Sequence, residues 1–190
     1  MSEVDQKIIE GVSKGKRRAQ NMLYQQHAPL MLGLCMRYAK DRNEAEDIMQ
    51  EGFIKIFTKI SDYRGDGSFE GWMRRIMVNT AITYYKKNLK HQYHTDIDEI
   101  DETIPHEEDD EGQPDEVKLP REKLMELIQG LPEGYRMVFN LYVFEQYAHK
   151  DIAETLNISV NTSKSQLSKA RRLLASKVVE ITGDKKIAIV

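Results

Sequence analysis

Cysteine is almost absent from the chain, and its scarcity excludes several classes of protein. The single cysteine, Cys35, cannot form a disulfide within one chain, and no CxxC pair or His/Cys cluster indicates a zinc site. No stretch approaches the ~20 apolar residues that a membrane span needs, and the first residues lack the apolar core of a signal peptide. We therefore expect a soluble cytoplasmic protein without metal, cofactor or membrane insertion, in which Cys35 is a buried structural thiol.

Charge is unevenly distributed along the 190 residues, although the net charge is only −3. Residues 1–95 carry 16 Lys or Arg against 11 Asp or Glu, and residues 117–190 carry 12 against 8. Between them, residues 96–116 carry 12 acids and no Lys or Arg. Two basic blocks flanking an acidic one predict two modules and a connector.

The acidic block also lacks the residues that build a core. Residues 96–116 contain no aromatic residue and include Pro105 and Pro114. Such a composition cannot bury enough apolar surface to fold alone. We therefore expect a flexible linker over 96–116, between a first domain over 1–95 and a second over 117–183, with a tail over 184–190.

No convincing strand pattern is present, and the spacing of apolar residues predicts an all-α fold. Candidate helices cover 5–12, 17–38, 42–61, 69–89, 121–129 and 133–144, with turn signals at 14–15, at Asp41 and at 64–67. Pro29 falls inside the second candidate helix, where it predicts a kink or a restart.

Residues 151–174 predict a helix-turn-helix. Asn157 lies where the chain must turn sharply and tolerates the left-handed conformation, and Ser159 is expected to cap the second helix. Five residues of the second helix share the expected inner face: Val160, Ser163, Leu167, Ala170 and Leu174. About half a turn away lies a polar and cationic set: Thr162, Ser165, Lys169 and Arg172.

That outward face suits the major groove of DNA. It carries no acidic residue between Ser159 and Val179, and the Lys-Ala-Arg-Arg run at 169–172 adds capacity to bind phosphates. A solvated pair of amphipathic helices has the same periodicity. The charge pattern, and not the periodicity, is therefore what favours DNA binding.

The predicted helix over 43–60 has an unusual outward side. Its core stripe is formed by Ala45, Met49, Phe53, Ile56 and Ile60, and its other side shows Asp47, Gln50, Glu51, Ile54 and Thr58. One exposed apolar residue means little by itself. An isoleucine surrounded by acids and amides nevertheless resembles a surface on which a protein partner docks.

Residues 63–90 interleave aromatic and cationic side chains. A glycine-rich loop bearing Tyr63 and Phe69 precedes a helix that carries Trp72, Arg74, Arg75, Asn79, Tyr84, Tyr85, Lys86, Lys87 and Lys90. Single-stranded nucleic acid is bound by such combinations, because bases stack on rings while cations follow the backbone. Core packing is the alternative for Trp72, Ile76 and Ala81. No GKS or GKT follows the loop, so a nucleotide-binding P-loop is not supported.

Three motifs in this order resemble the extracytoplasmic-function (ECF) sigma factors of bacterial RNA polymerase. AEDIMQEGFIKIF is similar to the family's core-binding helix, FEGWMRRIMVNTAITYYKK to the segment that recognises and melts the −10 element, and residues 131–174 to the domain that reads the −35 element. The resemblance covers nearly the whole chain. It implies a non-catalytic initiation factor whose partners are core polymerase, promoter DNA and an anti-sigma factor.

The resemblance also implies three sets of contact residues. Core polymerase would be bound by Asp47, Gln50, Glu51, Ile54 and Lys55. The melted −10 strand would be bound by Tyr63, Arg64, Phe69, Trp72, Arg75, Asn79, Lys86 and Lys87. The −35 major groove would be bound by Asn161, Thr162, Lys164, Ser165, Gln166, Lys169, Arg171 and Arg172.

Two departures from the family pattern and two rival functions accompany this interpretation. The family often has Gly-Thr-Val at 161–163, where this chain has Asn-Thr-Ser, so Ser163 is expected to weaken packing of the recognition helix slightly. Gln166 and Lys169 stand where Arg is frequent in the family.

Two other functions compete with that of a sigma factor. One is a helix-turn-helix regulator that acts without core polymerase. The other is an enzyme acting on nucleic acid, which would need a metal or nucleophile constellation.

Overall fold

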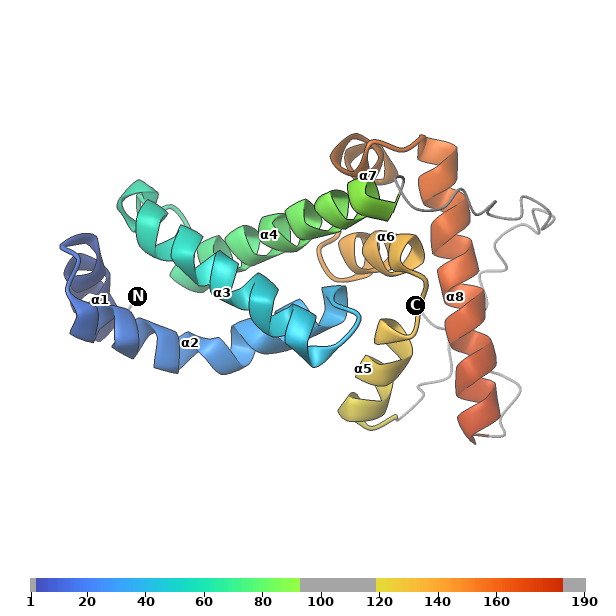
Figure 1. Cartoon of the computed structure of the whole chain (residues 1–190), viewed down its shortest axis with the longest axis horizontal. Helices are drawn as coiled ribbons and strands as arrows, with labels where there is room; N and C mark the ends of the chain where they lie inside the picture. The colour runs from blue at the N-terminus through green and yellow to red at the C-terminus, as the bar shows by residue number, and fades with distance from the viewer. Residues whose placement is uncertain (1–2, 93–118, 183–190) are drawn as a thin grey trace. The chain divides into compact units, whose positions relative to one another are not determined.

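A computed structural model describes residues 3–92 and 119–182, and every regular element in these two ranges is helical (Figure 1). The predicted all-α fold is thus confirmed. The chain divides into two compact units, Met1–Tyr84 and Tyr85–Val190. The predicted linker over 96–116 and tail over 184–190 lie outside the described residues.

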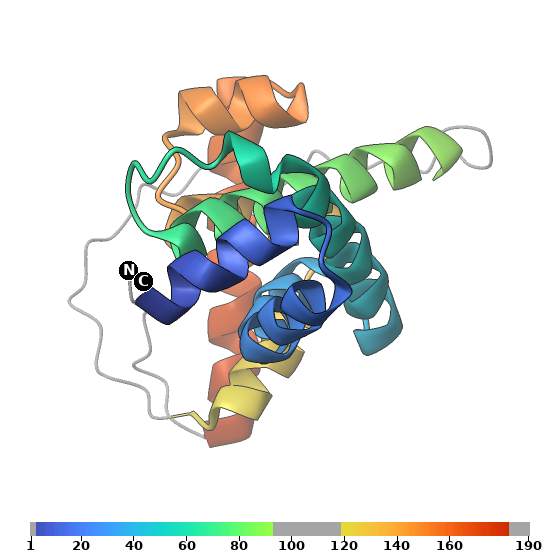
Figure 2. The same ribbon diagram turned by 90° about the vertical axis from the view of Figure 1, so that its left-hand side faces the viewer.

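The first unit contains α1 (Glu3–Ser13), α2 (Arg17–Tyr38), α3 (Arg42–Lys59), a short 3-10 turn η1 (Ile60–Asp62) and the first part of α4 (Phe69–Gln92). α2 packs on both α1 and α3. In Figure 2, where α2 is seen nearly end-on, α1 runs across the view, so the two helices cross steeply. Gly11 permits this crossing, because a Cβ added there would lie only 2.6 Å from the Cβ of Ala19.

Local sequence signals explain where the helices of the first unit begin and end. Gly15 adopts a positive φ of 68° in the turn between α1 and α2. Asp41 caps α3 by accepting a 2.9 Å hydrogen bond from the backbone N–H of Glu44, whose carboxylate in turn accepts from the N–H of Lys40. This reciprocal pairing satisfies N–H groups that have no partner within the helix.

Pro29 does not interrupt α2, which runs as one helix from Arg17 to Tyr38. The restart that Pro29 predicted is therefore wrong. Proline removes one hydrogen bond from the helix, here the one that the carbonyl of Gln25 would accept. Packing of α2 against two neighbouring helices evidently outweighs that local cost.

The core of the first unit is rich in sulfur-containing side chains. Met31, Cys35, Met73 and Met77 are fully buried, together with Ile56. Cys35 is thus the buried thiol that the sequence predicts, and burial raises its pKa to about 12 despite the opposing charge of Arg37. It remains a neutral, unreactive thiol at physiological pH.

The second unit contains the end of α4 from Tyr85 onward, together with α5 (Arg121–Gln129), α6 (Glu133–Val143), α7 (His149–Leu156) and α8 (Val160–Thr182). α8 packs against α5, α6 and α7 (Figure 1). The fully buried side chains at the centre are Ile128, Met137, Val138, Leu141, Ile152 and Leu174. The helix-turn-helix expected over 151–174 is formed by α7 and α8.

The turn between α7 and α8 has the predicted chemistry. Asn157 adopts the left-handed conformation, with φ 58° and ψ 47°. The hydroxyl of Ser159 accepts a 2.9 Å hydrogen bond from the N–H of Thr162 and thereby caps α8. Of the inner face, Ser163, Leu167, Ala170 and Leu174 are buried.

Val160 is the exception to the predicted inner face of α8. It is 40% exposed, so its assignment to the core was wrong. The residue is the first of α8 and follows the turn directly. Periodicity places a residue on a face of the helix. The residue is buried only where a neighbouring element packs against that turn of the helix.

Candidate functional site

The outward side of α3 is the first surface with an unusual composition. Asp47, Gln50, Glu51 and Ile54 are all exposed, and Ile54 is 64% exposed. The predicted core stripe on the other side of the helix is buried throughout. The helix therefore presents an apolar side chain to solvent within an acidic and amide surface, which we call the α3 face.

Ion pairing and hydrogen bonding hold Lys55 at the edge of the α3 face. Its ammonium group lies 2.7 Å from the Glu51 carboxylate and 3.3 Å from the hydroxyl of Thr80 on α4. Lys55 is thus partly engaged within the protein. On α4, partial burial and then the charges of nearby carboxylates, led by Glu44 and Asp47, raise the pKa of the Tyr84 phenol.

A groove of about 600 Å³ lies beside the α3 face, between α2 and α3. Its walls combine apolar and polar side chains: Tyr24, Gln25, Ala28, Pro29, Leu32, Arg42, Glu46, Met49 and Gln50. Gln50 belongs to both the groove and the α3 face. Sequence reasoning missed the α2 side of this surface.

Three aromatic rings meet where the glycine-rich loop joins α4. The ring centroids of Phe69 lie 5.0 Å from Tyr63 and 5.6 Å from Trp72, on which Phe69 is stacked. Phe69 is only 9% exposed, whereas Tyr63 and Trp72 are half-buried. The Phe69 ring therefore packs the start of α4 and leaves little surface on which a base could stack.

The loop itself has a defined conformation. Gly65 and Gly67 have φ values of 84° and 88°, which side chains rarely adopt. The Tyr63 hydroxyl donates a 2.8 Å hydrogen bond to the carbonyl of Gly67. The loop is thus tied across its base, and Arg64 is exposed at its start.

The outward side of α4 carries polar and cationic residues along its length. Arg75, Asn79, Lys86 and Lys87 are exposed. Because Asn79 is exposed, its side-chain amide is not buried among backbone groups of the core. An exposed amide has both a donor and an acceptor available to a ligand.

The outward side of α8 is polar and cationic. Asn161, Lys164 and Arg172 are exposed, and the others of the predicted set are half-buried: Thr162, Ser165, Gln166, Lys169 and Arg171. The Ser165 hydroxyl donates to the carbonyl of Thr162 at 3.1 Å, so it can offer a ligand its acceptor sites. The predicted set therefore lies along one accessible side of α8.

Arg171 also has a structural contact, which sequence reasoning missed. Its guanidinium lies 5.7 Å from the centre of the Tyr142 ring, and that ring stacks on His149 at 4.7 Å. His149 Nδ1 and the Ser163 hydroxyl share a 2.9 Å hydrogen bond. We call these four residues the polar seam, since they join α6, α7 and α8.

The polar seam changes the expectation for Ser163. Its side chain is fully buried, and it bonds to His149 instead of leaving a packing defect. A buried hydroxyl with a partner avoids the cost of an unsatisfied polar group. In a sequence alone, His149 gives no sign that it pairs with Ser163, because fourteen residues separate them.

Within residues 3–92 and 119–182, no three His, Cys, Asp or Glu side chains are grouped so that they could hold a metal ion. Over the same ranges, no helix combines the length and apolar character that crossing a membrane requires.

Comparison with known proteins identifies similar sequences over both units. Residues 23–90 match the family model for Sigma-70 region 2, and residues 121–174 match that for Sigma-70, region 4. The RNA polymerase sigma-H factor of Pseudomonas aeruginosa is 32% identical over 178 residues, which are 90% of this chain and 92% of that protein. The ECF RNA polymerase sigma-E factor of Haemophilus influenzae is 31% identical over 180 residues, 92% and 95% of the two chains.

A solved structure gives a weaker likeness. It contains the sigma factor RpoE in complex with the anti-sigma factor NepR from Bartonella quintana. The TM-score is 0.48 at 17% identity, over 85% of this chain and 97% of that one.

Proposed function

The chain belongs to the family of ECF RNA polymerase sigma factors, and we propose that its two helical units divide the steps of initiation between them. It binds core RNA polymerase and directs transcription from specific promoters. We assign the region 2 domain to residues 1–95, the acidic linker to 96–116 and the region 4 domain to 117–183, followed by the tail over 184–190.

The α3 face is assigned to core polymerase. Asp47, Gln50, Glu51 and Ile54 are exposed together, with Lys55 at their edge. An apolar centre within a polar surround is the usual composition of a docking surface. The neighbouring groove between α2 and α3 extends that surface with apolar side chains from α2.

The loop and the outward side of α4 are assigned to the −10 element. Arg64, Arg75, Asn79, Lys86 and Lys87 are exposed and can bind the backbone or a base edge of a melted strand. Tyr63 and Trp72 keep part of their ring surfaces accessible. Phe69 contributes indirectly, because it packs against both rings and holds them in place.

Melting of the promoter has a cost that these contacts must offset. Unstacking costs a few kcal/mol per base step. Stacking on an aromatic ring returns ~1–3 kcal/mol per base. Each captured base can therefore offset part or all of the cost of the step from which it is unstacked.

The outward side of α8 is assigned to the −35 element in the major groove. Arg172, Lys164 and Asn161 are its most accessible residues, and Thr162, Ser165, Gln166 and Lys169 lie beside them. Arg171 is expected to contact the phosphate backbone, since the Tyr142 ring holds part of its guanidinium.

A single observation separates the sigma factor from a helix-turn-helix regulator that works without polymerase. Ile54 is 64% exposed within a surface of acids and amides, and that surface continues through Gln50 into the groove between α2 and α3. A regulator that binds only DNA would not need a protein-docking surface such as the α3 face. Run-off transcription with purified core polymerase tests the difference, since a regulator would not restore initiation to core enzyme.

The same family membership supports three further proposals. The chain performs no catalysis of its own, and it acts in the cytoplasm, where polymerase and promoter are found. An anti-sigma factor restrains it until a signal arrives. Co-purification of the chain from cells, with and without the inducing stress, would test for that partner.

A further inference from the structure

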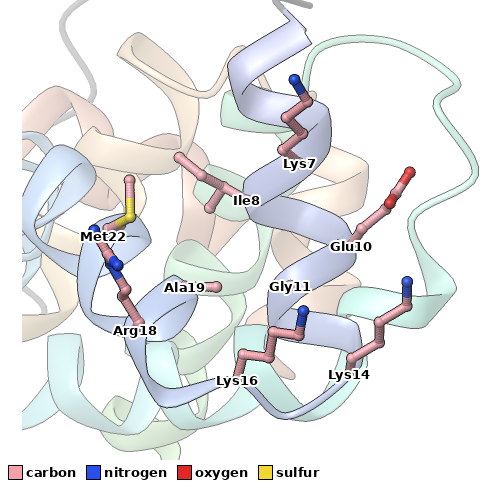
Figure 3. A pocket seen from close by; sticks show the side chains of 9 residues that line it. All are labelled: Lys7, Ile8, Glu10, Gly11, Lys14, Lys16, Arg18, Ala19 and Met22. Atoms are coloured by element: carbon pink, nitrogen blue, oxygen red, sulfur yellow. The ribbon is translucent and has the colours of Figure 1, made fainter.

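A second groove lies between α1 and α2, and none of its lining residues belongs to a surface assigned above. It has a volume of about 480 Å³ and is lined by residues of both helices and the turn between them: Lys7, Ile8, Glu10, Gly11, Lys14, Lys16, Arg18, Ala19 and Met22 (Figure 3). No residue of α3, α4 or α8 lines it. Neither polymerase binding nor promoter recognition, as assigned here, accounts for it.

The groove combines an apolar floor with a cationic rim. Ile8 and Ala19 lie where the two helices meet, and Met22 is 44% exposed beside them. Four cationic residues and a single acid complete the lining. Exposed methionine adapts its shape to varied apolar partners, while the surplus of positive charge selects an acidic one.

We propose that this groove docks an acidic, amphipathic segment of a protein partner, with an aliphatic side chain on the apolar floor and carboxylates on the cationic rim. Charge complementarity selects the acidic partner. The lining contains no aromatic ring, so it offers no stacking platform of the kind that single-stranded nucleic acid uses. An aliphatic anchor, in contrast, fits a floor of isoleucine, alanine and methionine.

The separation of this groove from the α3 face has a functional consequence. A segment bound between α1 and α2 leaves Asp47, Glu51 and Ile54 uncovered. The partner can therefore remain bound while the chain engages core polymerase. Binding of the segment requires neither polymerase nor DNA, so its failure would be distinct from a failure of the proposed function.

The test uses the full chain and a fluorescein-labelled synthetic peptide. The peptide is helical, with Asp and Glu on one side and leucines at positions i, i+3 and i+7 on the other. A control peptide keeps every charge and replaces the leucines with serine. Fluorescence anisotropy at near-physiological salt should show binding of the leucine peptide at least about tenfold tighter than the serine peptide.

Two neighbouring arginines provide a matched pair of variants. Arg18 lines the groove, whereas the adjacent Arg17 does not, and both are exposed in the first turn of α2. Arg18→Glu should weaken binding of the leucine peptide by about tenfold and Arg17→Glu by less than about threefold. Glutamate in the first turn favours the helix, so both variants should fold, which circular dichroism would verify.

Met22→Ala tests the apolar floor separately from the charge. It should weaken the leucine peptide severalfold and leave the serine peptide unchanged, because only the leucine peptide places an aliphatic group there. Since Met22 is 44% exposed, the change should not disturb the fold.

Three results would overturn the proposal. Equal losses with Arg17→Glu and Arg18→Glu would show only general attraction to a basic surface. Tighter binding of an oligothymidylate, sensitive to Arg18→Glu, would identify a nucleic-acid site. Peptide binding that appears only after the acids of 96–116 are replaced by Asn and Gln would identify the chain's own linker as the occupant.

Discussion

The two units stabilise their helices by different means. The first has a core rich in methionine, with Met31, Met73 and Met77 fully buried. In the second, polar side chains connect the helices. Arg136 of α6 donates a 2.7 Å hydrogen bond to the carbonyl of Gln129 at the end of α5, and Ser163 of α8 bonds to His149 of α7.

This difference fits what each unit must do. Unbranched thioethers pack without directional demands and tolerate small shifts of the helices around them. A hydrogen bond between helices sets distance and angle, because its geometry is narrow. The unit that we propose binds polymerase and a melted strand thus has an adaptable core. The unit that we propose reads base edges has a recognition helix held by directional contacts.

The largest effect is expected at the α3 face. Asp47→Lys with Glu51→Lys should weaken binding of core polymerase by about 100-fold or more, because like charges then face a basic partner surface. The variant should still fold, since the exposed ion pair between Glu51 and Lys55 contributes less than about 1 kcal/mol. Sedimentation with purified core polymerase measures the loss.

The second unit provides the matched control for this double variant. Asp151→Lys with Glu154→Lys makes the same charge change at exposed positions of α7. Core binding should stay normal. Equal losses in the two double variants would mean that net charge, and not the α3 face, governs docking.

The next largest effect is a loss of stability, which should be large at a buried residue of the first unit and small at an exposed one. Phe69→Ala should lower the free energy of unfolding by ~3–5 kcal/mol, because it removes a buried ring from the aromatic cluster. Asn79→Ala should change stability by less than about 0.5 kcal/mol, since the residue is exposed. Thermal unfolding measures both.

Promoter opening then distinguishes the roles of these two residues. Asn79→Ala should impair transcription from a duplex promoter and spare a template that is already melted. Phe69→Ala should impair both templates. If Asn79→Ala were equally defective on both, the proposed capture of an unpaired base by Asn79 would be wrong.

A neighbouring pair on α8 tests the recognition helix. Arg172→Ala should weaken −35 binding by ~1–3 kcal/mol without lowering stability, because the residue is exposed. Arg171→Ala should also reduce stability by ~0.5–1 kcal/mol, since it loses the contact with the Tyr142 ring. Binding to promoter variants in the holoenzyme, with melting curves beside it, would separate the two. Unchanged affinity in both variants would remove α8 from the −35 interface.

The polar seam should contribute a smaller, coupled effect. His149→Ala leaves the buried Ser163 hydroxyl without this partner, which should cost ~1–3 kcal/mol. A double-mutant cycle of His149→Ala and Ser163→Ala should give a coupling of at least ~0.5 kcal/mol. Additive effects would show that the hydrogen bond does not stabilise the second unit.

The last effect concerns the thiol in the core of the first unit and appears only at alkaline pH. Burial raises the pKa of Cys35 from its ordinary value of 9.0 to about 12. Below pH 9 both folded and unfolded chains keep the thiol protonated, so Cys35 adds no pH dependence. Above pH 9 only the unfolded chain ionises, and stability should fall by ~1.4 kcal/mol per pH unit until the folded pKa is reached.

Comparison with Cys35→Ala isolates the contribution of this thiol to the pH dependence of stability. Denaturant unfolding between pH 9 and pH 10.5 should give a steeper decline for the natural chain than for the variant, since lysines and tyrosines titrate alike in both. Parallel declines would mean that Cys35 ionises as readily in the folded core as in water.

Local patterns in the sequence anticipated most of the helical architecture. The limits of α2 and α5 agree with the predicted ranges of 17–38 and 121–129. Asn157 and Ser159 form the predicted turn and cap. Each of these features depends on residues within one or two turns of helix, where spacing, capping and turn chemistry act directly.

The candidate sites could be predicted only in part. Charge and exposure on the α3 face followed from helical periodicity, and so did the outward side of α8. The burial of Phe69 did not, because three rings from two segments had to meet. Nor did the pairing of His149 with Ser163, or the two grooves that α2 forms with its neighbouring helices.

The sequence by itself determined which segments are helical, which side of each is apolar, and how charge is divided among the three blocks. Motif order alone was also enough to indicate the family. Tertiary structure decided that α2 continues through Pro29, that Val160 stays exposed and that Arg171 packs on Tyr142. The reason is that helix propensity and periodicity are local properties, whereas burial and side-chain pairing depend on which elements meet in space.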